Sequence, residues 1–292
     1  MRGREKKKRA RPSGLVLAAA AISVWAGACA NPGKVSEKNA QLHAAKLAEL
    51  AKKDVLEIDQ GLPEGAKKLA PLYAKGDDPR SNLPQVRKDL QRIRRDVPDL
   101  LTAKSTFFAL ADDKGVAIRN DLEQDAMANQ NLVALFPDLA RAKDACATTT
   151  GAFPGPPGVS GPDRDWIAAC PIKGADGKTA GMLVTGWTYR GFSRHLQESL
   201  KRDISEQTRT ASDPGKLPIL YVGVFDKTGV YMAPLTPKID EDEFTKMNLV
   251  ERTAGGRAQG NLLLTERAFG WAAERVEKLG ADTGILVPRS EI

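Results

Sequence analysis

The chain has 292 residues, of which 41% are hydrophobic and 28% are charged, and its formal net charge is +7 at pH 7. That charge is concentrated at the start, because residues 1–14 hold seven of the 44 Lys and Arg and one of the 37 Asp and Glu, which leaves 37 and 36 in the remainder. The remainder is therefore close to neutral. It has no basic stripe with interleaved aromatic residues, so the composition argues against a nucleic-acid partner.

Residues 1–28 are predicted to be a signal peptide. The basic segment is followed by Leu15–Ala28, an apolar run of fourteen residues that ends in the small residues Ala26, Gly27 and Ala28. This order is typical of a secretory signal with its cleavage site, and the run is too short to span a bilayer comfortably. We therefore expect an exported protein, on the periplasmic side of a bacterial membrane or at the cell surface.

Cys29 follows the predicted cleavage site directly. The junction resembles a bacterial lipoprotein signal, in which the cysteine becomes the lipidated first residue and anchors the protein to a membrane. Ala26 stands where that signal usually has Leu, and Ala26 to Ala28 also suits ordinary cleavage. We favour lipidation, because a lone cysteine at this position is otherwise a coincidence. Residues 29–33 are expected to form a short tether.

Residues 34–104 are predicted to be helical. Apolar residues recur at spacings of three and four from Leu47 to Leu62 and again from Val86 to Val97. Gly61, Pro63 and Gly65 are expected to end the first helix, so that a short helix over 66–74 and another over 83–96 follow. The basic side chains around residues 87–95 are expected to form a solvated face.

A hairpin pattern occurs twice in the chain. Phe107–Asn120 and Tyr221–Pro234 each contain two apolar runs of alternating pattern around an Asp-x-x-Gly turn, with an offset of 114 residues between the copies. Glycine can adopt the positive φ that such a turn requires, and the flanking residues are typical of strands. The repetition predicts two similar lobes.

Further strands complete each predicted lobe. Trp166–Tyr189 is predicted to be a second strand pair around an Asp-Gly turn, and a helix with apolar residues at four-residue spacing follows it. After the second hairpin, residues 234–253 are expected to be a charged loop or short helix, and residues 260–275 and 284–289 are expected to be strands. Residues 266–279 also fit a helical period. We keep a strand there because the repeat calls for a continuous antiparallel sheet.

Two cysteines remain after Cys29, namely Cys146 and Cys170, on either side of a loop rich in proline and glycine. Since an exported protein folds in an oxidising compartment, we expect a disulfide between them. Two buried free thiols are the alternative. The proline and glycine content of residues 148–162 excludes a helix or a central strand there.

Taken in order, these elements resemble the paired PAS-like lobes of extracytoplasmic double Cache sensor domains. The resemblance implies an α+β fold with a long N-terminal helical region followed by two lobes with antiparallel sheets. The expected parts are a first lobe over 105–189, a connecting helix over 190–216 and a second lobe over 217–292. Most Cache proteins continue into a membrane helix and an output domain, which we do not expect here.

The resemblance also implies where a ligand binds. In Cache-like domains the connector that corresponds to residues 121–145 covers the open face of the sheet and helps to close a pocket. We expect the ligand site in the first lobe, whose connector is the longer one. The predicted ligand-binding residues are Arg119, Asp121, Trp187 and Tyr189, with Asn120, Asp125 and Trp166 beside them and Tyr231, Arg267 and Trp271 as candidates in the second lobe.

Ordinary structural roles remain open for these residues. Acidic residues near a helix start are usually solvated, and aromatic residues at such strand positions more often pack against a helix. His43 and His195 are the two histidines of the chain, and neither has a partner at metal-ligand or triad spacing. No catalytic motif, metal site or cofactor is therefore predicted.

We expect an exported, lipid-anchored module that recognises a small polar ligand and acts with a separate membrane signalling protein. An envelope scaffold without a small ligand and a hydrolytic enzyme are the alternatives.

Overall fold

The computed structural model describes residues 32–74, 78–102, 107–153, 163–210 and 217–291. The predicted signal peptide, Cys29 and residues 154–162 of the Pro and Gly-rich loop lie outside these ranges. Pro32 and Gly33, which were expected in the tether, are the first two residues of helix α1. Within the described ranges, no helix is both long enough and apolar enough to cross a membrane.

Helix α1 (Pro32–Leu69) is one continuous helix, so the predicted interruption at residues 61–65 is wrong. Pro63 removes one backbone N–H from the helix but does not end it. The two glycines serve close packing. A Cβ atom on Gly61 would lie 2.8 Å from Leu100 Cγ, and one on Gly65 would lie 2.9 Å from Leu183 Cδ2.

Short helical elements follow α1. They are the 3-10 helices η1 (Ala70–Tyr73) and η2 (Pro79–Asn82), then α2 (Leu83–Asp96) and α3 (Pro98–Thr102). Helix α2 has the predicted bounds, because Asn82 caps its start through the N–H of Gln85 and its apolar stripe of Val86, Leu90 and Ile93 is buried.

The first sheet contains β1 (Phe107–Asp112), β2 (Ala117–Asn120), β3 (Ala147–Gly151), β4 (Asp165–Lys173) and β5 (Thr179–Thr188) in the order β2-β1-β5-β4-β3. All its strand pairs are antiparallel, which confirms both predicted pairs. Edge strand β3 occupies the start of the segment that was expected to be a loop. A disulfide joins Cys146 to Cys170, as predicted.

The connector over residues 121–145 is mostly not helical, which corrects the prediction. Only α4 (Leu132–Leu135) and the 3-10 helix η3 (Pro137–Lys143) form. Asp125 explains the difference, because its carboxylate accepts hydrogen bonds from the backbone N–H groups of Met127 and Ala128. Such local side-chain bonds compete with helix formation.

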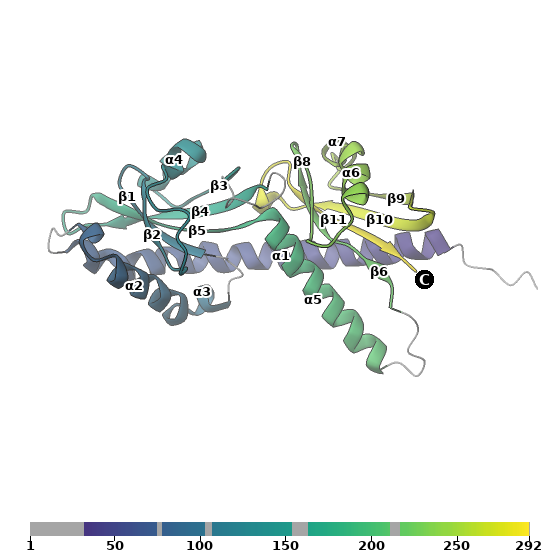
Figure 1. Cartoon of the computed structure of the whole chain (residues 1–292), viewed down its shortest axis with the longest axis horizontal. Coiled ribbons are helices and arrows are strands. Elements are labelled where there is room, and N and C mark those ends of the chain that lie inside the picture. Colours follow the sequence, from purple (N-terminus) through teal and green to yellow (C-terminus); the bar gives the residue numbers. More distant parts are fainter. Residues whose placement is uncertain (1–31, 75–77, 103–106, 154–162, 211–216, 292) are drawn as a thin grey trace, which may run out of the picture. The chain divides into compact units, whose positions relative to one another are not determined.

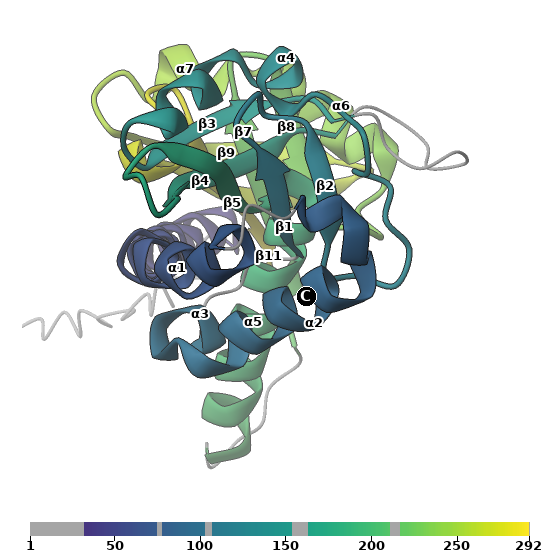
Figure 2. The same ribbon diagram turned by 90° about the vertical axis from the view of Figure 1, so that its left-hand side faces the viewer.

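Helices α1 and α2 lie on one side of the first sheet, and α4 lies on the other (Figures 1 and 2). Each side has its own apolar core. Phe108, Leu110 and Leu183 belong to the core on the α1 side, whereas Met182 and Val184 belong to the core beneath the connector. This alternation along β5 is the predicted one.

Helix α5 (Tyr189–Thr210) leads into the second lobe. The second lobe contains β6 (Ile219–Leu220), β7 (Gly223–Asp226), β8 (Gly229–Met232), α6 (Lys238–Lys246), α7 (Leu249–Arg252), β9 (Arg257–Leu264), β10 (Arg267–Arg275), η4 (Glu277–Leu279) and β11 (Gly284–Ser290). Its sheet has the order β8-β7-β11-β10-β9, with β6 paired to β11. The second sheet therefore repeats the strand order of the first, and the ambiguous segment is strand β10.

Helix α1 packs against both sheets. Near its start, Ser36 Oγ accepts a hydrogen bond from the N–H of Glu291 at 3.2 Å, and a Cβ atom on Gly270 would lie 2.0 Å from the Glu37 nitrogen. Further along the same helix, Gly65 faces Leu183 of the first sheet. One apolar core cluster accordingly includes residues from α1 and from both sheets.

The two hairpin aspartates have equivalent contacts. In the first hairpin, Asp112 Oδ1 accepts from the N–H groups of Lys114 and Val116, and its Oδ2 lies 2.7 Å from Arg80 Nη2. In the second, Asp226 Oδ1 accepts from Thr228, and its Oδ2 lies 2.6 Å from Arg164 Nε. Each carboxylate thus closes its turn and holds an arginine, but Arg164 belongs to the first lobe, so the second pair joins the two lobes.

Candidate functional site

Arg119 and Asp121 make close contacts within the first lobe. Arg119 Nη1 lies 3.0 Å from Asp125 Oδ2, and its Nη2 donates to the carbonyl oxygen of Leu122 at 2.8 Å. Asp121 is buried, accepts a hydrogen bond from the N–H of Phe108 at 2.8 Å and lies 2.8 Å from Arg94 Nη2. These contacts fix the chain after β2.

Trp187 and Tyr189 lie on the α1 side of the first sheet, away from the connector. The Trp187 ring is stacked between Trp166 and Phe192, with both centroids at 4.4 Å. Tyr189 is the first residue of α5 and meets Tyr231 edge to face at 5.4 Å. Burial raises the pKa of Tyr189 to about 12.

The structure therefore does not bring the four predicted residues to one cavity. Trp187 and Tyr189 belong to the core cluster on the α1 side, where they pack the following helix. The opposite face of the first sheet is filled by apolar side chains of the strands, α4 and η3, including Phe136 and Leu139. Ligand binding by Arg119, Asp121, Trp187 and Tyr189 stays a prediction.

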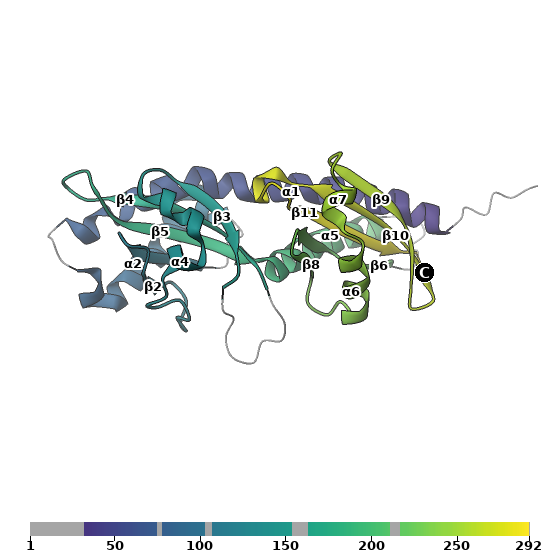
Figure 3. The same ribbon diagram turned by 90° about the horizontal axis from the view of Figure 1, so that it is seen from above.

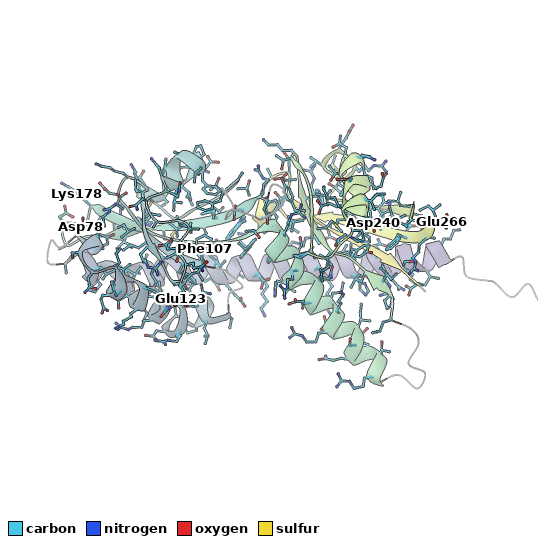
Figure 4. The ribbon with its side chains drawn as sticks, viewed as in Figure 1. Asp78, Phe107, Glu123, Lys178, Asp240 and Glu266 are labelled. Carbon is cyan, nitrogen blue, oxygen red and sulfur yellow. A yellow bond between two sulfur atoms is a disulfide. The ribbon has the colours of Figure 1, made fainter. Side chains whose placement is uncertain are left out.

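A hollow of about 640 Å³ lies in the second lobe, between β8, α6 and the start of α5. Helix α6 lies beside β8 (Figure 3), and Asp240 marks this helix in Figure 4. The volume is within the range of small-molecule sites. The lining residues are Arg190, Thr228, Gly229, Val230, Tyr231, Ala233, Pro234, Leu235, Thr236, Lys238, Glu241, Asp242 and Thr245.

Arg190 and Glu241 form the rigid wall of this hollow. The two guanidinium Nη atoms lie 2.6 and 2.8 Å from the two carboxylate oxygens, which is the bidentate geometry of a strong ion pair. Burial raises the pKa of Glu241, but Arg190, the N–H of Met232 and Lys238 lower it by more, so its net pKa lies below the usual range. The carboxylate therefore stays ionised.

Lys238 and Asp242 form the exposed rim of the hollow. Lys238 Nζ lies 2.6 Å from Asp242 Oδ1, but the two side chains are 73% and 51% exposed, so their pairing is weak. A charged group of a ligand can replace either partner at little cost. The rim thus provides one cationic and one anionic side chain that a ligand can contact.

Ligand binding by the second-lobe candidates Tyr231, Arg267 and Trp271 also stays a prediction. Tyr231 lines the hollow, and its hydroxyl is 2.8 Å from Thr228 Oγ1. Trp271 is buried in the core beneath α6 and α7, whereas Arg267 is exposed at the start of β10. His195 Nε2 pairs with the buried Asp54 at 3.1 Å and His43 contacts Arg289, so both histidines serve packing.

Sequence reasoning missed Arg190, Lys238 and Glu241. Lys238 and Glu241 lie in the segment that was interpreted only as a charged loop or short helix, and Arg190 lies in the predicted connecting helix. The acidic run over residues 240–243, which follows directly on a repeated hairpin, is the signal that could have indicated a functional surface. Across the described residues, no group of three or more His, Cys, Asp or Glu could hold a metal ion.

No protein-family model matches the chain, and no curated protein matches it in sequence. Solved structures do match. An extracellular domain of the histidine kinase vpHK1S-Z8 is similar with a TM-score of 0.58 and 12% identity, over 89% of this chain and 93% of that one. The chain has the two-lobe Cache-like sensor fold.

Two further structures support this fold. The periplasmic sensory domain of the Campylobacter jejuni chemoreceptor Tlp1 is similar with a TM-score of 0.51 and 10% identity, over 89% of this chain and 96% of that one. An extracellular ligand-binding receptor from Desulfohalobium retbaense gives a TM-score of 0.51 and 11% identity over 85% of this chain, which spans 39% of the receptor. These neighbours are sensory or ligand-binding domains and not enzymes. At such identities the likeness shows the fold and no ligand.

Proposed function

We propose that the chain is an exported, lipid-anchored module that recognises a small polar molecule and passes its state to a separate membrane signalling protein. The observation that carries this proposal is the hollow of the second lobe, because it combines a fixed ion pair with an exposed cation and anion. A concave site with a few convergent polar groups is the usual form of a small-molecule site. The sensor fold supports the same interpretation.

The binding proposal is tested by a thermal-shift screen of the mature domain against amino acids, short peptides, carboxylates, nucleobases and polyamines. A ligand at one hundred times its Kd stabilises the folded state by about 2.7 kcal/mol. A hit is then measured on Lys238→Ala, with Lys246→Ala as the control, because Lys246 lies on the same helix and pairs with Glu243 outside the hollow.

The expected result is loss of affinity in Lys238→Ala and wild-type affinity in Lys246→Ala. Arg119→Ala tests the competing site in the first lobe. Loss of affinity in Arg119→Ala alone would move the site to the first lobe, and the absence of any hit would contradict small-molecule recognition.

The anchor is tested separately at Cys29, which lies outside the described residues. We expect radiolabelled palmitate to be incorporated into the wild-type protein and not into Cys29→Ser, and globomycin to block maturation. A mature wild-type protein without lipid would contradict the anchor.

A further inference from the structure

Strand β8 is an edge strand, and its hydrogen-bonding pattern fixes which backbone groups point outward. The N–H of Ala233 points towards β7 and donates to the carbonyl of Val222. The backbone groups of Met232 point to the opposite side, where its N–H donates to Glu241 and its carbonyl accepts from Arg190. In an antiparallel pair the bonded and non-bonded residues alternate. Val230, two residues before Met232, therefore directs its N–H and C=O away from β7, and it lines the hollow.

The first lobe shows what occupies the same edge there. Ala111 and Phe225 are equivalent at the 114-residue offset, and their cross-strand partners are Ala117 and Val230. The N–H of Ala117 donates to the carbonyl of Gln130, and its carbonyl accepts from the N–H of Asn129. A peptide segment of the chain itself thus covers this edge in the first lobe.

In the second lobe the chain takes a different course. After Met232 it turns into α6, and within the described residues no hydrogen bond reaches the outward N–H or C=O of Val230. From the proposed function of this hollow, and resting on it, we propose that a short extended peptide binds there and pairs its backbone with Val230.

The open part of the β8 edge is short, which favours a short peptide as the ligand over a long strand from a protein partner. On one side of Val230 the groups of Met232 are already bonded, and on the other side the Asp226 turn ends the strand. One residue is left for an incoming strand, which is too little for the long strand addition of a protein partner. The amino and carboxyl ends of a short peptide have partners in Asp242 and Lys238 at the rim.

The test uses trialanine as the free peptide and N-acetylalanine N-methylamide as a peptide unit without charged ends. Amide hydrogen exchange of the wild-type mature protein is followed with and without each probe. Slower exchange at Val230 in the presence of trialanine supports the proposal. Unchanged exchange at Val230 while trialanine binds would overturn it.

Val230→Pro removes only the outward donor, and proline is tolerated in edge strands where its nitrogen faces outward. We expect at least a tenfold weaker affinity for both probes in Val230→Pro, and wild-type affinity in Lys246→Ala, because Lys246 pairs with Glu243 outside the hollow. Lys238→Met should weaken trialanine and leave the capped probe unchanged. Should Val230→Pro fail to fold, the exchange measurement on the wild type decides.

The two proposals fail in different ways. A screen that finds a non-peptide ligand sensitive to Lys238→Ala, together with no binding of trialanine, would reject the peptide and leave small-molecule recognition standing. A screen without any ligand would reject both.

Discussion

Asp165 is the residue at which burial and charge conflict most clearly. Its side chain is 6% exposed, and it accepts one backbone hydrogen bond, from the N–H of Phe153. Burial, with the nearby charge of Asp163, raises the pKa of Asp165 to about 7 against the opposing effect of that hydrogen bond. The folded protein therefore holds a proton on this carboxyl at pH values where the unfolded chain has lost it.

The sign of the pH dependence follows from this difference. Between about pH 4 and pH 7 the folded state binds more protons at Asp165 than the unfolded state, so its contribution to stability falls as the pH rises. We expect Asp165→Asn to raise the free energy of unfolding at pH 8 by about 4 kcal/mol, since the pKa of Asp165 is raised from 3.8 to about 7 and one pKa unit corresponds to about 1.4 kcal/mol. Urea unfolding of the wild type and the variant at pH 4.5 and pH 8 measures this difference in the free energy of unfolding.

His43 supplies the control, because its contribution has the opposite sign. Burial, with the charge of Arg289, lowers its pKa to about 4, so its contribution is present above pH 6.5 and is lost as the pH falls towards 4. His43→Gln should therefore flatten the acid side of the profile only. Equal stability of Asp165→Asn and the wild type at pH 8 would contradict the predicted effect of Asp165.

Among the elements, α1 comes so close to β10 that only glycine fits at residue 270. A Cβ atom there would lie 2.0 Å from the nitrogen and 2.4 Å from the Cα of Glu37, both backbone atoms of the helix. Such contacts cannot be relieved by rotating a side chain. The start of α1 and the second sheet would have to move apart.

We therefore expect Gly270→Ala to lower the free energy of unfolding by about 1 to 3 kcal/mol, as overpacked sites do. Gly255→Ala is the matched control, because no atom lies within 4 Å of a Cβ there. Chemical denaturation of both variants measures the difference. Equal midpoints in the two variants would show that α1 does not rest on β10.

Ser193 joins α5 to the second hairpin. Its buried hydroxyl donates to the carbonyl of Tyr231 at 2.8 Å and accepts from the N–H of Val224 at 2.9 Å, so it is inserted between two paired strands. Removing it leaves a buried N–H without its partner, which costs about 1 to 3 kcal/mol.

Ser193→Ala should lower stability by that amount, and Ser193→Thr, which keeps the hydroxyl, should recover part of it. Thermal unfolding of the two variants provides the measurement. A wild-type melting temperature in Ser193→Ala would mean that β7 and β8 close the gap by direct pairing.

The two similar lobes and the hairpins could be predicted because they depend on local alternation and on a repeat within the chain. The hollow of the second lobe could not be predicted. Its open backbone group depends on the course of the chain after the hairpin, which covers the equivalent Ala117 in the first lobe but turns into α6 in the second. The matching Asp and Gly of the two copies do not reveal this difference. Residues 61–65 likewise looked like a helix end, because the packing of Gly61 and Gly65 against Leu100 is not visible in the local sequence.

At the scale of the whole molecule, the Arg164 and Asp226 pair connects the lobes through side chains that are 17% and 5% exposed. Breaking a pair this buried leaves an uncompensated charge, which costs about 3 to 5 kcal/mol. Each single variant, Arg164→Met or Asp226→Asn, should be strongly destabilised. In the double variant the loss should be smaller than the sum of the two.

A double-mutant cycle on the free energy of unfolding measures this coupling. Arg80 with Asp112 is the control, because Asp112 is the equivalent hairpin aspartate and its arginine comes from the preceding helical region instead of from the other lobe. Separate unfolding transitions of the lobes are expected only when the Arg164 pair is broken. Additive single effects would show that the pair does not couple the lobes.

The contacts of α1 have a consequence for the order in which the chain can fold. Ser36 and Asn39 near its start bond to Glu291, and these partners are about 250 residues apart in sequence. Contacts of such separation slow folding, because the loop between them must be closed first. While the chain is being synthesised, the first half of α1 exposes its apolar stripe until β10 and β11 arrive. The second sheet must therefore be completed last, and a chaperone that covers α1 in the meantime would raise the yield of folded protein.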